Sequence, residues 1–149
     1  MRADLHEMLP GNQETHWKEF FNQDSAQFFP QFVGLIAEEV RLDYARMRLP
    51  YRPLLDQPAG VVHGGAIATL IDTVVVPAVA SRYDAVPTMF TVDMQIRYLG
   101  AAREQDLIAE GWITKRGKST VFCQAEVRTA GDDEVVAEGW HVYRVMPPR

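Results

Sequence analysis

The segment from His63 to Asp72 holds the residue types of this chain that could do chemistry. Two glycines follow the histidine, and an almost wholly apolar run then leads to a single carboxylate. A glycine-rich helix start offers unpaired backbone N–H groups and the positive end of the helix dipole, which stabilise an oxygen that becomes negative. Asp is a poor interior helix former and is rarely buried without a partner. A carboxylate and an oxyanion site on one element indicate hydrolysis or acid–base chemistry.

The helix that must carry this pair is predicted from residue 64 to about residue 81. Its apolar positions cover nearly the whole circumference, which is typical of a helix buried on most sides. The exceptions, Thr69, Asp72 and Thr73, share one narrow stripe because they stand at i, i+3 and i+4. Pro77 lacks the N–H that would bond to the carbonyl of Thr73, so we expect the helix to kink or end there.

Strands are predicted after this helix. Residues 90–98 alternate apolar and polar side chains with a clean two-residue period. Three further strands are predicted at residues 105–115, 121–127 and 135–145, with tight turns at residues 116–118 and 131–133 between them.

The part before the helix is less regular. Residues 14–29 are rich in aromatic side chains and are predicted to form one or two short helices, with Asp24–Ser25 as the cap of the second. Two extended segments are predicted at residues 32–40 and 42–49, and three prolines mark residues 50–62 as a loop.

These elements predict an α+β fold in which an antiparallel sheet wraps around one long central helix. A helix that is apolar all round needs cover, and the concave face of the sheet needs a filling. We divide the chain into a short helical N-terminal extension, residues 1–31, and a main domain, residues 32–149.

Composition bounds the function. Of the 149 residues, 47% are hydrophobic and 23% charged, which is ordinary for a soluble globular domain, and the net charge of −5 argues against general nucleic-acid binding. Cys123 is the only cysteine, which excludes an intrachain disulfide and a thiolate metal site. We expect no secretory signal, and the longest apolar run, residues 74–80, is far shorter than the ~20 residues that span a bilayer. We expect a cytoplasmic protein that contacts neither nucleic acids nor membranes and needs no metal or cofactor.

The chain resembles the hotdog-fold acyl-CoA thioesterases of the PaaI type, which are related to the 4-hydroxybenzoyl-CoA thioesterases. The resemblance covers roughly residues 33–145 and rests on three motifs: His63-Gly64-Gly65 followed by Asp72, Thr91-Val92-Asp93-Met94 in the next strand, and Arg116-Gly117-Lys118 at a later turn. It implies the hotdog fold and the hydrolysis of an acyl-CoA to a free acid and coenzyme A, which is then part of the substrate.

The resemblance also implies roles for individual residues. The N–H of Gly64 would polarise the thioester carbonyl, and Asp72 would act as general base or nucleophile. Thr91 would hold the attacking water, and Gln57 would contact the thioester or the water. We expect His63 to orient the loop rather than to transfer protons.

A second group of residues is expected to bind substrate. Gly65 lies beside the oxyanion position. Some relatives carry a threonine one turn beyond the acid, where this chain has Val76, so Thr73 is the candidate substitute. Arg and Lys suit phosphate oxygens, and the candidates for the phosphates of coenzyme A are Arg97, Lys115, Arg116 and Lys118.

The spacing of Gly64 and Asp72 predicts the assembly. Eight residues of helix separate them by ~12 Å along the axis. A base and an oxyanion donor must both come within about 3 Å of one reacting group, which one chain cannot achieve with these two residues. A site that uses both combines Gly64 of one protomer with Asp72 of another, and a two-fold dimer would hold two such sites. We expect a homodimer or a dimer of dimers.

Two other functions stay open. A hotdog dehydratase or hydratase would act on an acyl thioester with a histidine and an acid together, and the separation of His63 from Asp72 disfavours that arrangement within one chain. A non-catalytic acyl-CoA binding module would bind without turnover. Aromatic, branched and medium straight-chain acyl groups all remain candidates.

Overall fold

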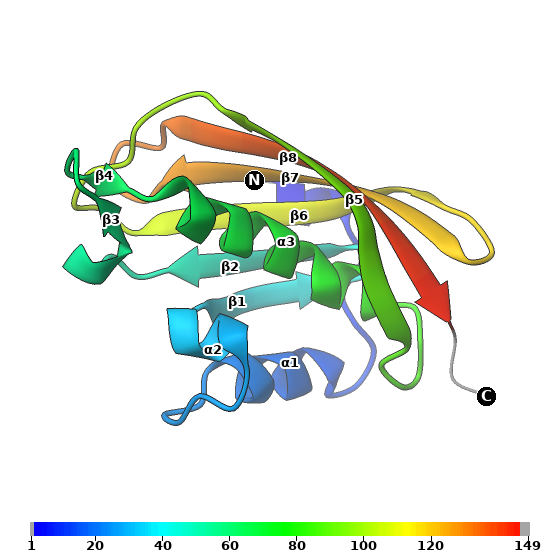
Figure 1. The fold of residues 1–149 in the computed structure, drawn as a ribbon. Coiled ribbons are helices and arrows are strands. Elements are labelled where there is room, and N and C mark those ends of the chain that lie inside the picture. The colour runs from blue at the N-terminus through cyan, green and yellow to red at the C-terminus, as the bar shows by residue number, and fades with distance from the viewer. Residues whose placement is uncertain (1, 147–149) are drawn as a thin grey trace.

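The computed structural model describes residues 2–146. Its central feature is one long helix, α3 (Gly64–Ala80), which lies across a curved antiparallel sheet (Figure 1). The strands of this sheet are β1 (Ile36–Arg41), β2 (Tyr44–Leu49), β5 (Thr88–Tyr98), β6 (Leu107–Arg116), β7 (Thr120–Thr129) and β8 (Val135–Met146). They are ordered β1-β2-β6-β7-β8-β5, so β1 and β5 form the two edges. The predicted sheet around a central helix is confirmed.

The helix α3 is buried on most sides, as its apolar circumference predicts. Ile71, Val74 and Val75 are fully buried against the sheet. Two glycines in the strands allow this close approach. A Cβ at Gly111 of β6 would lie 2.9 Å from Val74 and Val75, and one at Gly139 of β8 would lie 2.5 Å from Ile71. Side chains at these two strand positions would push the helix off the sheet.

The predicted C-terminal bound of α3, near residue 81, is confirmed. The helix continues through Pro77 to Ala80, so it does not end at the proline, which was one of the two outcomes expected there. Pro77 is buried in the core, and this packing offsets the hydrogen bond that its missing N–H cannot make. The next residue, Ser81, closes the helix: its hydroxyl donates to the carbonyl of Ala78 (2.8 Å) and accepts from the N–H of Asp43 (2.8 Å).

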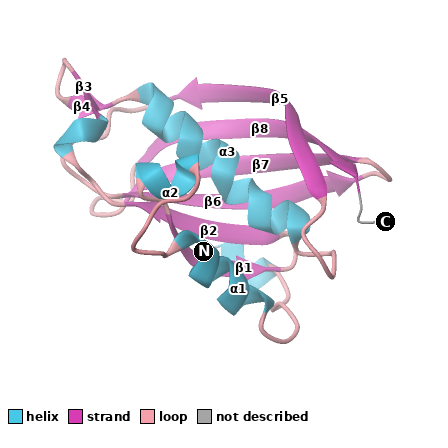
Figure 2. Cartoon of the chain, turned by 60° about the horizontal axis from the view of Figure 1, so that its bottom comes forward, coloured by secondary structure: helices cyan, strands magenta, loops and turns pink. Residues whose placement is uncertain are grey.

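Short helices precede the sheet, as predicted. They are η1 (Arg2–Leu5), α1 (Gln13–Phe21) and α2 (Phe29–Val33). α1 lies against β1, while α2 reaches α3 (Figure 2). The predicted cap at Asp24–Ser25 is wrong. The side chain of Gln31 instead accepts the backbone N–H groups of Gln27 (2.8 Å) and Phe28 (2.9 Å) where α2 begins.

Two boundaries before α3 also differ. The first strand begins at Ile36 rather than Phe32, because Pro30 suits the first turn of α2 and Gly34 ends that helix in the left-handed region (φ 92°). The predicted loop at residues 50–62 contains three short elements: η2 (Pro53–Leu55), β3 (Asp56–Gln57) and β4 (Val61–Val62), the last two paired as a hairpin. The four strands predicted after α3 are all present, with ends shifted by at most two residues.

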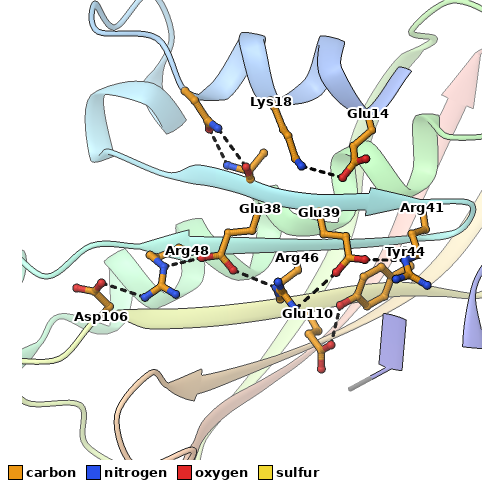
Figure 3. A network of polar contacts seen from close by, with 12 residues as sticks. Glu14, Lys18, Glu38, Glu39, Arg41, Tyr44, Arg46, Arg48, Asp106 and Glu110 are labelled. Carbon is orange, nitrogen blue, oxygen red and sulfur yellow. Dashed lines mark hydrogen bonds and ion pairs between the residues drawn. The ribbon is translucent and has the colours of Figure 1, made fainter. Parts of the chain in front are cut away.

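The face of the sheet away from α3 carries a network of ion pairs (Figure 3). Glu38 accepts hydrogen bonds from Arg46 (3.0 Å) and Arg48 (2.6 Å) across β1 and β2. Nearby, the hydroxyl of the buried Tyr44 donates to Glu110 (2.6 Å). These contacts tie the β1 side of the sheet together. In residues 2–146, no helix is long and apolar enough to cross a membrane.

Candidate active site

The carboxylate of Asp72 is held by two hydroxyl groups from the sheet. Thr91 of β5 donates to Oδ1 of Asp72 (2.8 Å), and Tyr143 of β8 donates to the same oxygen (2.9 Å). The Tyr143 hydroxyl also lies 2.9 Å from the backbone carbonyl oxygen of Asp72. The acid that the sequence singles out is therefore partnered, which explains how an apolar helix tolerates it.

Sheet register brings these hydroxyls together. Thr91 and Tyr143 are direct cross-strand partners in the β5–β8 ladder, so their side chains lie side by side on one face. The register shifts immediately after Thr91, between Thr91 and Asp93, which leaves Val92 as an extra residue in β5. Such a bulge changes the direction in which the following side chains point, and bulges are common beside active sites. The Thr91 side chain therefore points toward α3 just before the bulge changes the alternation of side chains along β5.

Two buried titratable side chains lie beside this cluster. Burial, together with the charge of Asp72, raises the pKa of Tyr143 far above its usual value, so its hydroxyl stays protonated and can donate. His141 occupies the same face of β8, and burial lowers its pKa. Neither ring nitrogen of His141 bonds to a residue within 2–146. The acid therefore has neutral neighbours on β8.

The start of α3 forms a second polar cluster. Nδ1 of His63 accepts the N–H of Gly65 (2.8 Å) and so caps the helix, while the hydroxyl of Tyr98 donates to the carbonyl of Gly64 (2.9 Å). No residue within 2–146 accepts a hydrogen bond from the N–H of Gly64. The first turn thus keeps one donor available for a ligand, at the positive end of the helix. His63 is placed to orient this turn.

A groove of about 540 Å³ opens at this end of α3. It brings together three predicted site residues, Gln57, Gly64 and Gly65, with Tyr98 as a further wall. Asp72 does not line it. Because α3 runs unbroken from Gly64 to Ala80, the separation of ~12 Å between Gly64 and Asp72 applies in the folded chain. Within one protomer, the start of α3 and the Asp72 carboxylate therefore form two separate polar clusters.

The predicted substrate-binding residues are more scattered. Thr73 is buried in the core. The exposed Arg97 places its guanidinium 4.9 Å from the ring centroid of Trp140, and Lys118 is exposed in the β6–β7 turn. Neither side chain lines the groove. The structure gathers Gly65 but not Thr73, Arg97 or Lys118 around Gly64.

Arg116 closes the far end of α3. Its Nη2 donates to the carbonyls of Ala78 and Val79 (2.9 Å each), and its Nε donates to Asp43 (2.7 Å). These carbonyls are the unpaired acceptors at a helix C-terminus, where a cation is favoured. Arg116, one of the cations predicted to meet phosphates, therefore has its Nε and Nη2 donors occupied by the fold.

Arg116→Ala is expected to lower the free energy of unfolding by about 2 kcal/mol, because it leaves helix carbonyls and Asp43 without their charged donor. Lys118→Ala is the matched control, since it removes an exposed cation two residues away and should change stability by less than about 0.5 kcal/mol. Urea unfolding followed by circular dichroism measures both. Equal stabilities for the two variants would contradict the capping role.

Sequence reasoning missed Tyr98, Tyr143 and His141. The Tyr98 hydroxyl contacts Gly64, and the Tyr143 hydroxyl contacts Asp72. The last strand did carry a signal for two of them. His141 and Tyr143 share with Gly139 and Val145 the strand face that packs against α3. Polar atoms on an otherwise apolar strand face indicate a buried partner.

Comparisons with known proteins match this fold and this segment. Among solved structures, a conserved protein of Pseudomonas aeruginosa superposes with a TM-score of 0.76 at 26% identity, covering 81% of this chain and 95% of that one. The Escherichia coli PaaI protein, from the phenylacetic acid degradation operon, has a TM-score of 0.76 over 90% of this chain and 91% of its own, at 17% identity. These likenesses show that the fold is the predicted hotdog fold.

Sequence comparisons reach the family. A Halobacterium salinarum protein provisionally named an esterase is 34% identical over 68% of this chain and 70% of its own. Human acyl-coenzyme A thioesterase 13 is 29% identical over 55% of this chain, and the match spans only 59% of the human protein. Residues 59–136, which include Gly64, Asp72 and Thr91, match the family model described as the thioesterase superfamily. The chain belongs to the thioesterase superfamily.

Proposed function

We propose that this protein hydrolyses an acyl-CoA thioester to a free acid and coenzyme A, at sites shared between two copies of the chain. The observation that carries the proposal is the pair of half-sites on α3: a free N–H at Gly64 and a carboxylate at Asp72 held by two hydroxyls. The human relative named as an acyl-coenzyme A thioesterase supports the substrate class.

The chemistry follows from these groups. Asp72 accepts a proton from water as the water oxygen adds to the thioester carbonyl carbon. The oxygen that becomes negative is stabilised by the N–H of Gly64 at the helix N-terminus. The tetrahedral intermediate then collapses, the C–S bond breaks, and the thiolate of coenzyme A leaves and takes up a proton. Gln57, on the wall of the same groove, orients the thioester, and Thr91 can accept a hydrogen bond from the water.

The edge strand β5 is the surface on which the second copy docks. It pairs with β8 on one side only, and its eleven residues are mostly exposed, including Phe90 (57%) and Val92 (61%). A long edge strand with exposed apolar side chains is a template for pairing with another chain. Asp72, which is half-buried on α3, lies beside this edge, because Thr91 of β5 donates a hydrogen bond to its carboxylate.

The contacts along β5 predict the register of the dimer. Tyr98 touches Gly64 and Thr91 touches Asp72, so β5 runs antiparallel to α3. A two-fold axis that pairs two β5 edges antiparallel therefore also sets the two α3 helices antiparallel. If the axis passes near Ala68, midway between positions 64 and 72, each Gly64 faces the Asp72 of the partner. One interface then completes two sites.

Mixed dimers test the shared site. In a dimer of one Gly64→Pro chain and one Asp72→Asn chain, one of the two sites keeps both Gly64 and Asp72, so we expect about half of the wild-type kcat, although each parent dimer is nearly inactive. Co-expression with two different affinity tags gives the mixed dimer. A mixed dimer as inactive as its parents would mean that both residues act from one chain, and the shared site would be wrong.

Release of free thiol from a panel of acyl-CoA substrates tests the reaction itself. Hydrolysis liberates the thiol of coenzyme A, which a thiol reagent detects. A dehydratase or hydratase would change the acyl chain without releasing thiol. A binding module would retain acyl-CoA without turnover, and Asp72→Asn would leave its affinity unchanged. Either of these outcomes would contradict the proposed hydrolysis.

A further inference from the structure

We infer that Tyr143 is a positioning residue, which holds Oδ1 of Asp72 and leaves Oδ2 as the oxygen that takes the proton from water. The inference rests on the proposed hydrolysis, because it assigns a role to each oxygen of the proposed base. It adds a residue from the last strand, 71 positions away in the sequence, to a site otherwise built from α3, β5 and the loop before α3.

The two carboxylate oxygens have different surroundings. Oδ1 accepts hydrogen bonds from both Thr91 (2.8 Å) and Tyr143 (2.9 Å). Oδ2 accepts none from any residue between 2 and 146. An oxygen that already accepts two strong donors has less electron density to offer to a proton, so the unpaired oxygen is the better acceptor. The geometry therefore assigns the reactive position to Oδ2.

Of the two hydroxyl donors to Asp72, Tyr143 is the more buried and has the more fixed position. It is 3% exposed, and its hydroxyl lies 2.9 Å from both Oδ1 and the backbone carbonyl oxygen of Asp72. One hydroxyl thus contacts both the side chain and the main chain of the same residue, which fixes the rotamer of the carboxylate relative to α3. Thr91 is exposed on β5, so its hydroxyl can rotate and also contact water.

The titratable groups around Asp72 determine how the pH dependence of the rate is interpreted. The titratable groups that face this cluster are His141 on β8, Cys123 on β7 and Asp93 on β5. Burial lowers the pKa of His141 and raises the pKa of Cys123 to about 12, so both are neutral between pH 7 and the alkaline range. Asp93→Asn and His141→Gln remove the other two groups that can gain a proton in the acidic limb, so a movement of that limb on altering Tyr143 that persists in both backgrounds reports on Asp72.

Tyr143→Phe tests the inference, since it removes the hydroxyl and keeps the buried ring. We expect kcat to fall by about 10- to 100-fold with KM unchanged, because a hydrogen bond to a charged group is lost. The acidic limb of the kcat/KM profile should move to higher pH, because the carboxylate form loses a donor that favours it. Initial rates of thiol release between pH 4 and pH 9 measure both effects.

Tyr44→Phe is the matched control. Tyr44 is also fully buried, and its hydroxyl also donates to a carboxylate, that of Glu110, but on the opposite face of the sheet from α3. It should lose comparable stability and keep the wild-type kcat and pH profile. Tyr143→Phe behaving like Tyr44→Phe in both readouts would overturn the inference while the proposed hydrolysis stands, provided that Asp72→Asn is inactive. Full activity of Asp72→Asn would instead remove the proposed function.

A second variant covers the case in which Tyr143→Phe does not fold. Site-specific replacement of Tyr143 by 3-fluorotyrosine keeps the ring and makes the hydroxyl a stronger donor. The acidic limb should then move to lower pH, the opposite direction to the phenylalanine variant. An acidic limb that stays in place in the folded fluorotyrosine protein would also overturn the inference.

Discussion

Asp72→Asn is expected to lower kcat by about 10²- to 10⁴-fold, the range that removal of a general base usually causes. Asparagine keeps the shape of the side chain and can still accept hydrogen bonds from Thr91 and Tyr143 through its amide oxygen. Its other terminal atom becomes an NH₂ group, which donates and cannot accept the proton of water. The loss should therefore appear in kcat, with little change in KM.

Asp93→Asn is the control for Asp72→Asn. It removes a carboxylate two positions after Thr91 on the same strand, whose exposed side chain interacts electrostatically with His141 and shares no hydrogen bond with Asp72. Its kcat should stay close to that of the wild type. Thiol release from one acyl-CoA substrate, with thermal unfolding to verify the fold, compares the two variants. A folded Asp72→Asn protein with the wild-type rate would show that another group activates water.

The elements of the fold that periodicity specifies were predictable. α3 and the four strands after it carry apolar patterns set by burial against each other, and these patterns gave their type and approximate bounds. The failures lie where a side chain far from the pattern decides the local structure. Gln31 caps α2, and Gly34 ends it in the left-handed region. Gln at N3 and Gly at the C-cap are both residues that helix caps favour, but the extended segment predicted at residues 32–40 took precedence over this capping pattern.

The residues of the candidate site show the same difference. The roles of Asp72 and Gly64 could be predicted because both lie on one helix, where sequence spacing converts directly into distance. The contact of Tyr143 with Asp72 could not be predicted, because it depends on the order of the strands and on the register of β5 against β8. Arg116 shows the reverse problem. Its charge suggested a phosphate ligand, but only the fold reveals that α3 ends beside it.

Gly64→Pro is expected to lower kcat by about 10²- to 10³-fold, the usual cost of removing one oxyanion donor. Proline deletes the N–H that no residue within 2–146 accepts, and the fold tolerates it because Gly64 is the first residue of α3. The preceding His63 already has the extended conformation (φ −61°, ψ 135°) that a following proline requires. The variant therefore removes a donor without breaking the helix.

Gly64→Ala separates the donor from the added atoms. Both variants place a Cβ 3.3 Å from the ring of Tyr98 and so share this contact, while proline also adds Cγ and Cδ beside the nitrogen that it blocks. Only the alanine variant keeps the N–H. We expect Gly64→Ala to retain most of the wild-type kcat, and the ratio of the two rates of thiol release then measures the contribution of the N–H. Equal losses in the two variants would assign the defect to crowding against Tyr98, and the transition-state oxygen would need another donor.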